Sequence, residues 1–190
     1  MRLFVAAELS DEMRQAATAT IADLQHRLGR RVVARWLPTD NLHITVRFIG
    51  EVSETIASDV LRALSAPISL EPFDLRFGAC GAFPSGGLPR VIWIGLANGA
   101  PSLATINGEM SGRLDRFGFE AEPRSYSAHL TIARVKEVAR GSTSDVRRIL
   151  RETPIPDGHC RVDHATIFRS QLSPKGARYE SLATCSFLYP

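Results

Sequence analysis

Hydrophobic residues recur at three- and four-residue spacing in four segments of the chain, and this spacing predicts four helices. The segments are 10–28, 53–66, 103–117 and 142–150. Ser10 is an N-cap residue followed by two acids, and Gly29 ends the first apolar stripe. Ser142 and Asp145 resemble a variant capping box for the fourth helix.

Between these segments lie short apolar or alternating runs that predict strands. The runs are 3–8, 32–37, 42–49, 70–79, 91–96, 127–135, 162–168 and 179–189. Two groups of turn-forming residues, at 85–87 and 173–176, join neighbouring runs. The order strand, helix, two strands, helix, strand occurs in the first half and again, more loosely, in the second. We therefore expect an internal duplication.

Length and composition limit the class of protein. With 190 residues the chain is one compact unit or two closely packed lobes. An apolar fraction of 44% and a charged fraction of 23% exclude a disordered, collagen-like or coiled-coil chain. No apolar run approaches the roughly 18 to 20 residues of a spanning helix, and the N-terminal run reaches Glu8 after five apolar residues. We expect neither a membrane protein nor a secreted one.

The charge and the cysteines narrow the possibilities further. A net charge of +3 is too small for binding nucleic acid by bulk electrostatics, so any recognition of phosphate must be local. Cys80, Cys160 and Cys185 are widely separated and form no CxxC pair. This pattern argues against a disulfide framework or a zinc knuckle and favours the reducing cytoplasm.

The strongest signal is a tetrapeptide of the form His, apolar, Thr, apolar that occurs in both halves of the chain. The interpretation rests on HITV at 43–46 and HLTI at 129–132, both inside predicted strands. Because side chains alternate across a strand, each histidine shares one face with its threonine, and the two apolar residues take the other face. Each strand therefore presents an imidazole beside a hydroxyl.

Two histidines facing one cleft are suited to acid–base chemistry on a phosphodiester. One neutral imidazole takes a proton from water, and a protonated one gives a proton to the departing oxygen. The hydroxyls of Thr45 and Thr131 are hydrogen-bond donors for phosphoryl oxygens, and Arg134 adds a fixed charge. Arg134 lies five positions after His129, so a bulge or the strand end must turn it toward the histidine face.

A metal site is the competing interpretation of the histidines. Metal sites usually recruit three or more ligands, and no further His, Asp, Glu or Cys lies in the tetrapeptides or in the two residues after them. We therefore expect no metal. His26, His159 and His164 are interpreted as structural or solvated, although His164 also has a threonine two positions later, Thr166.

With these motifs the chain resembles the 2H phosphoesterases, and among them the bacterial and archaeal RNA 2′,3′-cyclic phosphodiesterases formerly called 2′-5′ RNA ligases. The resemblance covers nearly the whole chain. The matching segments are MRLFVA at 1–6, RW at 35–36, NLHITVRFIG at 41–50, GAFP at 81–84, PRVIW at 89–93, HLTIAR at 129–134 and SQLSPKGARY at 170–179. Two departures are Val46 in place of the usual leucine and Ala128 in place of a proline, which predicts a looser loop before His129.

The resemblance implies an α+β, bilobal fold with two antiparallel sheets, flanking helices, a pseudo-twofold axis and an active cleft between the lobes. Residues 1–190 then form a single bilobal domain. His43 would be the general acid at the ribose 3′ oxygen and His129 the general base that activates water, although the residues alone do not assign these roles. The resemblance further implies that Thr45, Thr131 and Arg134 hold the phosphate and that Phe48 stacks on the terminal base.

The expected activity is hydrolysis of 2′,3′-cyclic phosphate RNA ends, or of cyclic nucleotides, to 2′-phosphates without cofactor or metal. Two alternatives stay open. One is 2′-5′ ligation, which is the reverse chemistry, and the other is a non-catalytic module that binds an RNA end or a nucleotide. We expect a monomer in the cytoplasm, with no membrane partner.

Overall fold

A computed structural model describes residues 1–120, 123–173 and 176–188 of the chain. The helices are α1 (Asp11–Leu28), α2 (Glu54–Ser65), α3 (Ala100–Asp115) and α4 (Thr143–Glu152), with 3-10 turns η1 (Gly29–Arg31) and η2 (Thr39–Asn41). The strands are β1 (Arg2–Ala7), β2 (Val32–Trp36), β3 (Ile44–Glu51), β4 (Ile68–Ser69), β5 (Phe73–Phe83), β6 (Val91–Asn98), β7 (His129–Val138), β8 (His159–Val162), β9 (His164–Ser173) and β10 (Gly176–Leu188).

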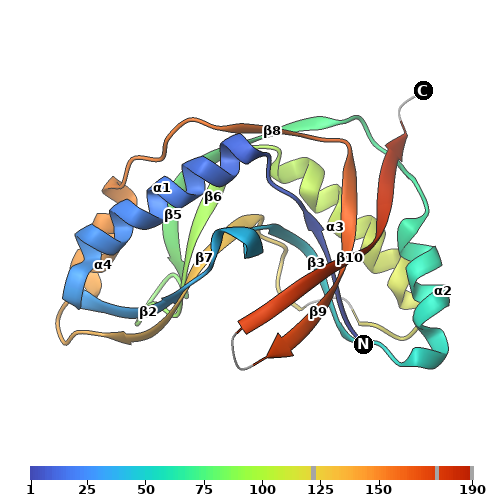
Figure 1. Cartoon of the computed structure of the whole chain (residues 1–190), viewed down its shortest axis with the longest axis horizontal. Coiled ribbons are helices and arrows are strands. Elements are labelled where there is room, and N and C mark those ends of the chain that lie inside the picture. Colours follow the sequence, from blue (N-terminus) through green and yellow to red (C-terminus); the bar gives the residue numbers. More distant parts are fainter. Residues whose placement is uncertain (121–122, 174–175, 189–190) are drawn as a thin grey trace.

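The strands form two sheet halves that meet between β3 and β7. The strand order is β4-β10-β9-β1-β3-β7-β6-β5-β8, and β2 pairs with β7. Neighbouring strands of the described residues are antiparallel apart from β4 and β10, which are parallel. The two halves are joined at one residue pair, Ile44 with Leu130. The predicted two antiparallel sheets are therefore present, and a single bridge connects them into one arched structure (Figure 1).

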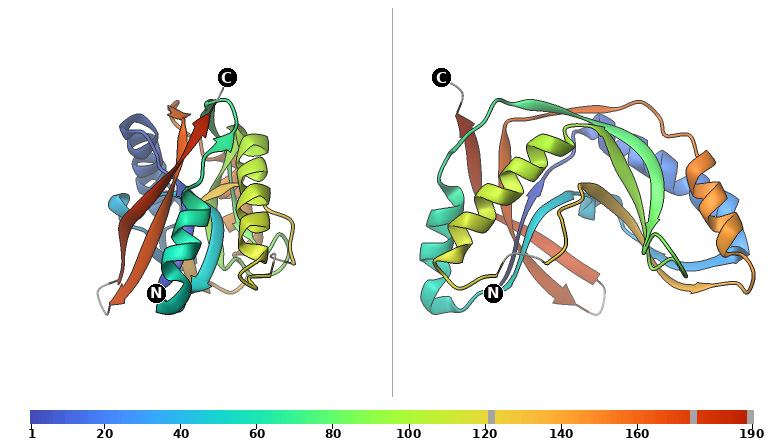
Figure 2. Two further views of the ribbon diagram at one scale, coloured as in Figure 1. Left: turned by 90° about the vertical axis from the view of Figure 1, so that its right-hand side faces the viewer. Right: turned by 180° about the vertical axis from the view of Figure 1, so that it is seen from behind.

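Each sheet half is covered by a pair of helices. Helices α2 and α3 pack together, with α3 on β3 and α2 on β9 and β10, whereas α1 and α4 pack together over β8 and β5. Helix α1 follows β1 along the chain but packs on β8, in the other sheet half. Helix α3 follows β6 but packs on β3, in the half that contains β1. Figure 2 shows the two helix pairs at opposite ends of the arch. This exchange of helices interlocks the two halves.

The four helices agree with the hydrophobic pattern, and most of their ends do too. Ser10 caps α1, because its hydroxyl accepts a hydrogen bond from the Met13 backbone N–H at 3.1 Å. The predicted capping box at the start of α4 is wrong. Ser142 has helical backbone angles and makes no side-chain cap, and Asp145 pairs with Arg148 at 3.1 Å instead. No helix in the described ranges is both long and apolar enough to cross a bilayer.

The strands differ from the prediction mainly at their ends. The run predicted at 162–168 is divided between β8 and β9, and the short strand β4 was missed. His43 lies immediately before β3 rather than inside it. The predicted turn at 85–87 joins β5 to β6, whereas the turn predicted at 173–176 and the end of the run 179–189 include residues outside the described ranges.

A close approach between β5 and β6 leads to a test of the packing. The indole of Trp93 lies over the backbone of Gly81, so that a β-carbon on Gly81 would be 2.3 Å from Trp93 Cζ2. We expect Gly81→Ala to push the indole aside and to lower the free energy of unfolding by about 1–3 kcal/mol, the usual cost of overpacking. Gly86→Ala is the matched control, since a β-carbon there meets nothing within 4 Å. Equal urea midpoints for the two variants would contradict this.

Candidate active site

The strands that carry the two histidine motifs are bulged at equivalent positions. In β3, Thr45 pairs with Ala6 and Arg47 with Val5, so Val46 has no counterpart on β1. In β7, Thr131 pairs with Trp93 and Ala133 with Ile92, so Ile132 has no counterpart on β6. Both extra residues lie three positions after a histidine. The duplication therefore extends to the backbone irregularities of the two strands.

The bulges decide which side chains share the face of the histidines. A bulge shifts the alternation of side chains by one residue, so the fifth residue after each histidine turns toward the histidine face. These residues are Phe48 in β3 and Arg134 in β7, and both are exposed. Of the two expected means of redirecting Arg134, a bulge or the strand end, the structure has the bulge. The bulges thus place an aromatic ring of one lobe and a cation of the other on the histidine face.

Both bulges are held by hydrogen bonds from outside their own sheet ladders. The carbonyl of Val46 accepts a hydrogen bond from Asn107 Nδ2 of α3 at 2.7 Å. The carbonyl of Ile132 accepts one from the Leu37 backbone N–H at 2.9 Å. Because a buried carbonyl without a partner is costly, these donors stabilise the irregular strand geometry.

The bridge between the sheet halves fixes the relation between the two motifs. Ile44 and Leu130 face each other and are both fully buried. Their neighbours on each strand therefore point to the opposite face, where His43 lies beside Thr131 and Thr45 lies beside His129. Diagonal neighbours in an antiparallel pair are about 7–8 Å apart, which leaves room for one phosphoryl group between the histidines. By this register the four side chains lie on one face of the two strands.

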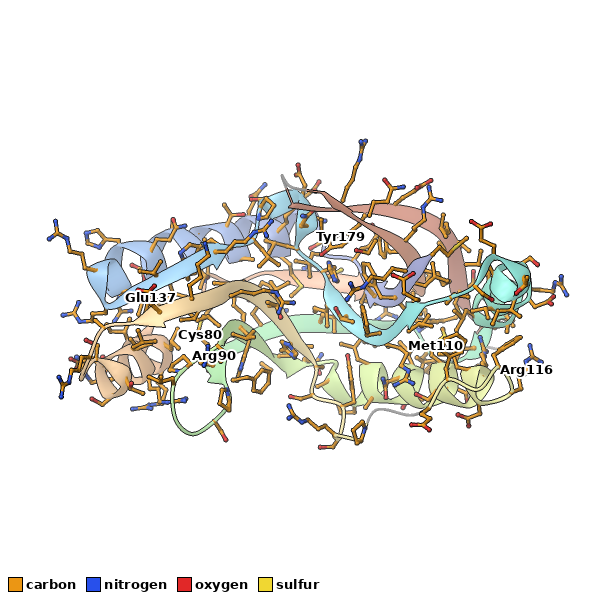
Figure 3. The ribbon with its side chains drawn as sticks, turned by 90° about the horizontal axis from the view of Figure 1, so that it is seen from below. Cys80, Arg90, Met110, Arg116, Glu137 and Tyr179 are labelled. Carbon is orange, nitrogen blue, oxygen red and sulfur yellow. The ribbon has the colours of Figure 1, made fainter. Side chains whose placement is uncertain are left out.

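A cavity of about 330 Å³ opens on this face. Its lining includes His43, both threonines and, from the two bulged strands, Phe48 and Arg134. His129 is not part of the lining and stands beside the cavity, next to Thr45. Seen from below, Tyr179 of β10, which also lines the cavity, lies near the middle of the molecule, between Glu137 toward one end and Arg116 at the other (Figure 3).

The cavity is positively charged. Arg2, Arg35 and Arg134 line it, and no Asp or Glu does. Within the described ranges none of the three arginines has an acidic partner. The guanidinium of Arg2 lies 5.0 Å from the centroid of the Phe48 ring and covers one of its faces. A cleft with this lining favours an anionic ligand that carries an aromatic group.

His43 is fixed by a backbone carbonyl and by aromatic rings. Its Nδ1 lies 2.9 Å from the Asn41 carbonyl oxygen, which can only accept, so Nδ1 carries a proton and Nε2 is the atom that exchanges one. Phe4 and Tyr179 pack against the ring, with centroids 4.8 and 5.0 Å away. Burial lowers the pKa of His43, the bond to Asn41 opposes this, and the charge of Arg14 adds to the lowering.

His129 has the same arrangement in the other lobe. Its Nδ1 lies 2.7 Å from the carbonyl oxygen of Ser127, two residues earlier, as Asn41 is two residues before His43. Phe83 packs edge-on against the ring at 5.0 Å, and Trp93 lies at 6.4 Å. Both imidazoles are therefore held in one tautomer, with Nε2 available for proton transfer.

The remaining histidines lie outside the cleft, as expected. His26 is exposed on α1. His159 contacts Glu12 at 3.0 Å, and His164 contacts Asp163 at 2.6 Å. In the part of the chain that the structure describes, no three His, Cys, Asp or Glu side chains are grouped so as to hold a metal ion.

Several residues of the site were not predicted. Arg2, Arg35, Trp36 and Tyr179 lie in matching segments of the resemblance but were given no role, and they line the cavity. Their strand neighbours alone do not indicate that three separate segments meet at one place. The loop before His129, expected to be looser because of Ala128, is held by a hydrogen bond from Tyr126 to the Thr45 carbonyl at 3.0 Å.

A known protein family matches both halves of the chain. The family profile described as LigT like Phosphoesterase matches twice, at residues 11–93 and 94–179, so the chain belongs to this family. The two matches correspond to the duplication predicted from the sequence.

Individual relatives extend over almost the whole chain. An RNA 2′,3′-cyclic phosphodiesterase of Archaeoglobus fulgidus is 33% identical over 96% of this chain and 98% of its own length. One from Methanocaldococcus jannaschii is 33% identical over 95% and 97%. Among solved structures, a protein of Thermus thermophilus has a TM-score of 0.74 at 25% identity, with 98% of each chain covered. Escherichia coli LigT, solved with 3′-AMP, has the same fold, with a TM-score of 0.74 at 24% identity over 98% of this chain and 97% of LigT.

The lowered pKa of His43 predicts a dependence of stability on pH. Below about pH 6.5 the unfolded chain binds the His43 proton more readily than the folded protein does, so acidification removes stability until the folded pKa is passed. His43→Gln removes this dependence. The stability of the wild type relative to His43→Gln should therefore fall between about pH 7.5 and pH 5.5 in urea unfolding. His26→Gln is the control, and a pH-independent difference for His43→Gln would contradict the prediction.

Proposed function

We propose that this protein hydrolyses 2′,3′-cyclic phosphate ends of RNA to 2′-phosphates by two-histidine acid–base catalysis without a metal. The observation that carries the proposal is the common face of His43 and His129, each with Nδ1 tied to a carbonyl and each beside a threonine. The chain's family and the activity of its curated relatives support the same reaction.

The cyclic phosphate would lie between the two motifs. Thr45 and Thr131 donate hydrogen bonds to the non-bridging oxygens, and the guanidinium of Arg134 balances their negative charge. In the described ranges neither threonine hydroxyl has a protein partner, so both are available to a ligand. The unpaired guanidinium of Arg134, turned to this face by the bulge in β7, needs no prior ion pair to be broken.

The reaction then needs two proton transfers. His129 Nε2 takes a proton from water as the water oxygen forms a bond to phosphorus. The bond from phosphorus to the ribose 3′ oxygen breaks, and His43 Nε2 gives its proton to that oxygen. The products are a 2′-phosphate and a 3′-hydroxyl, and the two histidines have exchanged protonation states.

The role of His43 as the acid depends on the substrate. In the free protein its lowered pKa favours the neutral ring. An anionic phosphodiester at the neighbouring threonine favours the charged ring, so the acid is generated when substrate binds. The Asn41 carbonyl keeps Nδ1 protonated throughout, which leaves Nε2 as the position of the transferable proton.

The terminal base would stack on Phe48. This ring is 41% exposed, and Arg2 covers one face, which leaves the other for a base. Stacking of this kind tolerates any base. The surplus cations Arg2 and Arg35 favour a ligand with more than one phosphate, as in an RNA end.

We also propose that residues 1–190 act as a single bilobal, monomeric domain in the cytoplasm. The exchange of helices between the two sheet halves supports the single domain, because α1 packs on the half that contains β5 and β8 and α3 packs on the half that contains β3. The three cysteines are buried and unpaired, which suits a reducing compartment.

Removal of either histidine tests the reaction. His43→Ala and His129→Ala should each lower kcat by about 10²- to 10⁴-fold, the usual contribution of general acid–base catalysis. Phosphorus NMR of an oligoribonucleotide with a 2′,3′-cyclic phosphate would follow the loss of the cyclic resonance and the growth of the 2′-phosphate. His26→Ala is the control. A shifted but persistent cyclic resonance means binding alone, and a 2′-5′ linked product with an added 5′-hydroxyl RNA means ligation.

The stacking role of Phe48 has its own test. Phe48→Ala should raise KM by about 5- to 100-fold, as expected for the loss of one base–aromatic contact, with a smaller change in kcat. Leu88→Ala is the matched control, because Leu88 is 56% exposed and does not line the cavity. Equal KM values for the wild type and Phe48→Ala would remove Phe48 from the binding site.

A further inference from the structure

The position of His129 relative to the first motif is weakly determined by the sheet. The β3–β7 ladder consists of one pair, Ile44 with Leu130, and His129 is the first residue of its strand. Pairing with Gly95 of β6 fixes His129 within its own sheet half, so its position relative to β3 depends on this one bridge and on contacts outside the ladder. The segment between α3 and β7 leads directly into His129, and two contacts attach it to β3.

The first contact is made by Tyr126, three residues before His129. Its hydroxyl donates a hydrogen bond to the backbone carbonyl of Thr45 at 3.0 Å. Burial raises the pKa of Tyr126 well above its usual range, so the hydroxyl keeps its proton and stays a donor. The bond therefore links the approach to the second motif with the threonine of the first.

The hydrogen bond of Tyr126 affects the His129 imidazole through the next residue in the chain. The residue after Tyr126 is Ser127, and its carbonyl is the group that accepts the Nδ1 hydrogen bond of His129 at 2.7 Å. A displacement of Tyr126 would therefore move the carbonyl that orients the imidazole. Register places Thr45 directly beside His129, so Tyr126 fixes both members of this pair.

The second contact is made by Arg47 on β3. Its guanidinium donates to the Glu120 carbonyl at the beginning of the same segment. Arg47 is only 3% exposed, whereas the equivalent position in the second motif is Ala133. Burying a guanidinium is costly, and its Nε has no hydrogen-bond partner in the described part of the chain. The segment is thus attached to β3 near both of its ends.

The first lobe uses a different arrangement for His43. There Arg14 donates to the Thr39 carbonyl at 2.9 Å, and Asn41 Nδ2 donates to the Ala177 carbonyl at 2.9 Å. These bonds hold the turn that supplies the carbonyl for His43. Both halves have the bulge, but the hydrogen bonds that hold the backbone next to each histidine differ between the two lobes.

We propose that Tyr126 is a positioning residue for His129, which holds the general base in register with Thr45 across the junction of the two sheet halves. The inference rests on the proposed function, because it assigns Tyr126 an effect on the chemical step. Tyr126 itself does not touch the substrate. The phosphate ligands Thr45, Thr131 and Arg134 keep their side chains when the tyrosine hydroxyl is removed.

The test is Tyr126→Phe, which removes one hydroxyl and keeps the ring. We expect kcat for the cyclic-phosphate RNA to fall about 3- to 10-fold with KM nearly unchanged, the effect of one lost hydrogen bond on alignment. Thr20→Val is the matched control, because Thr20 also donates a buried hydroxyl hydrogen bond to a carbonyl, that of Ala16 at 2.8 Å, but within α1. It should lower the melting temperature similarly and leave kcat unchanged.

A second measurement does not depend on turnover. In ¹⁵N NMR the ring nitrogens of His129 should report a single tautomer in the wild type and in Thr20→Val, and a mixture in Tyr126→Phe. An unchanged kcat and an unchanged His129 ring in Tyr126→Phe would overturn the inference while the proposed function stands. If the wild type does not hydrolyse the substrate, or if His129→Ala keeps full activity, the proposed function and the role of Tyr126 are both wrong.

Discussion

The structure depends on one narrow connection between two sheet halves, the pair Ile44 and Leu130. Because both residues are buried in the core, the opposite faces of their strands are forced to point together toward the cleft. The bridge determines which side chains become neighbours, and it does so for both motifs at once. A shift of one residue in this pairing would turn one histidine into the core, and no other ladder pair in the described part of the chain relates the two strands.

The duplication has kept geometry and changed chemistry. Both strands are bulged three residues after the histidine, and both bulges bring the fifth residue to the cleft. One lobe places Phe48 there and the other Arg134, so equivalent positions provide an aromatic ring and a cation. The same divergence is visible one position earlier, where a buried arginine in β3 corresponds to an alanine in β7. The bulge is common to both strands because it sets the direction of the following side chain, whatever that side chain is.

The electrostatics of the cleft follow from its burial and its lining. Three arginines without acidic partners in the described ranges line the same cavity as His43, and the Nδ1 atoms of His43 and His129 are both bonded to backbone carbonyls. In the proposed reaction an anion that enters the cleft favours the protonated ring of His43, so substrate binding would generate the acid. Aromatic rings pack against each of the two histidines.

The sequence by itself determined the four helices, the strand content, the duplication and the two His-Thr faces, because these depend on local periodicity and on residue type. It also required that a bulge or the strand end redirect Arg134, since side-chain alternation is a property of any strand. The single bridge, the exchange of α1 and α3 between halves, and the cation-rich lining from four segments were decided by tertiary structure. So was Tyr126, whose partner is a backbone carbonyl 81 residues away. Contacts between residues distant in the chain leave no periodic trace in the sequence, and only the folded backbone brings them together.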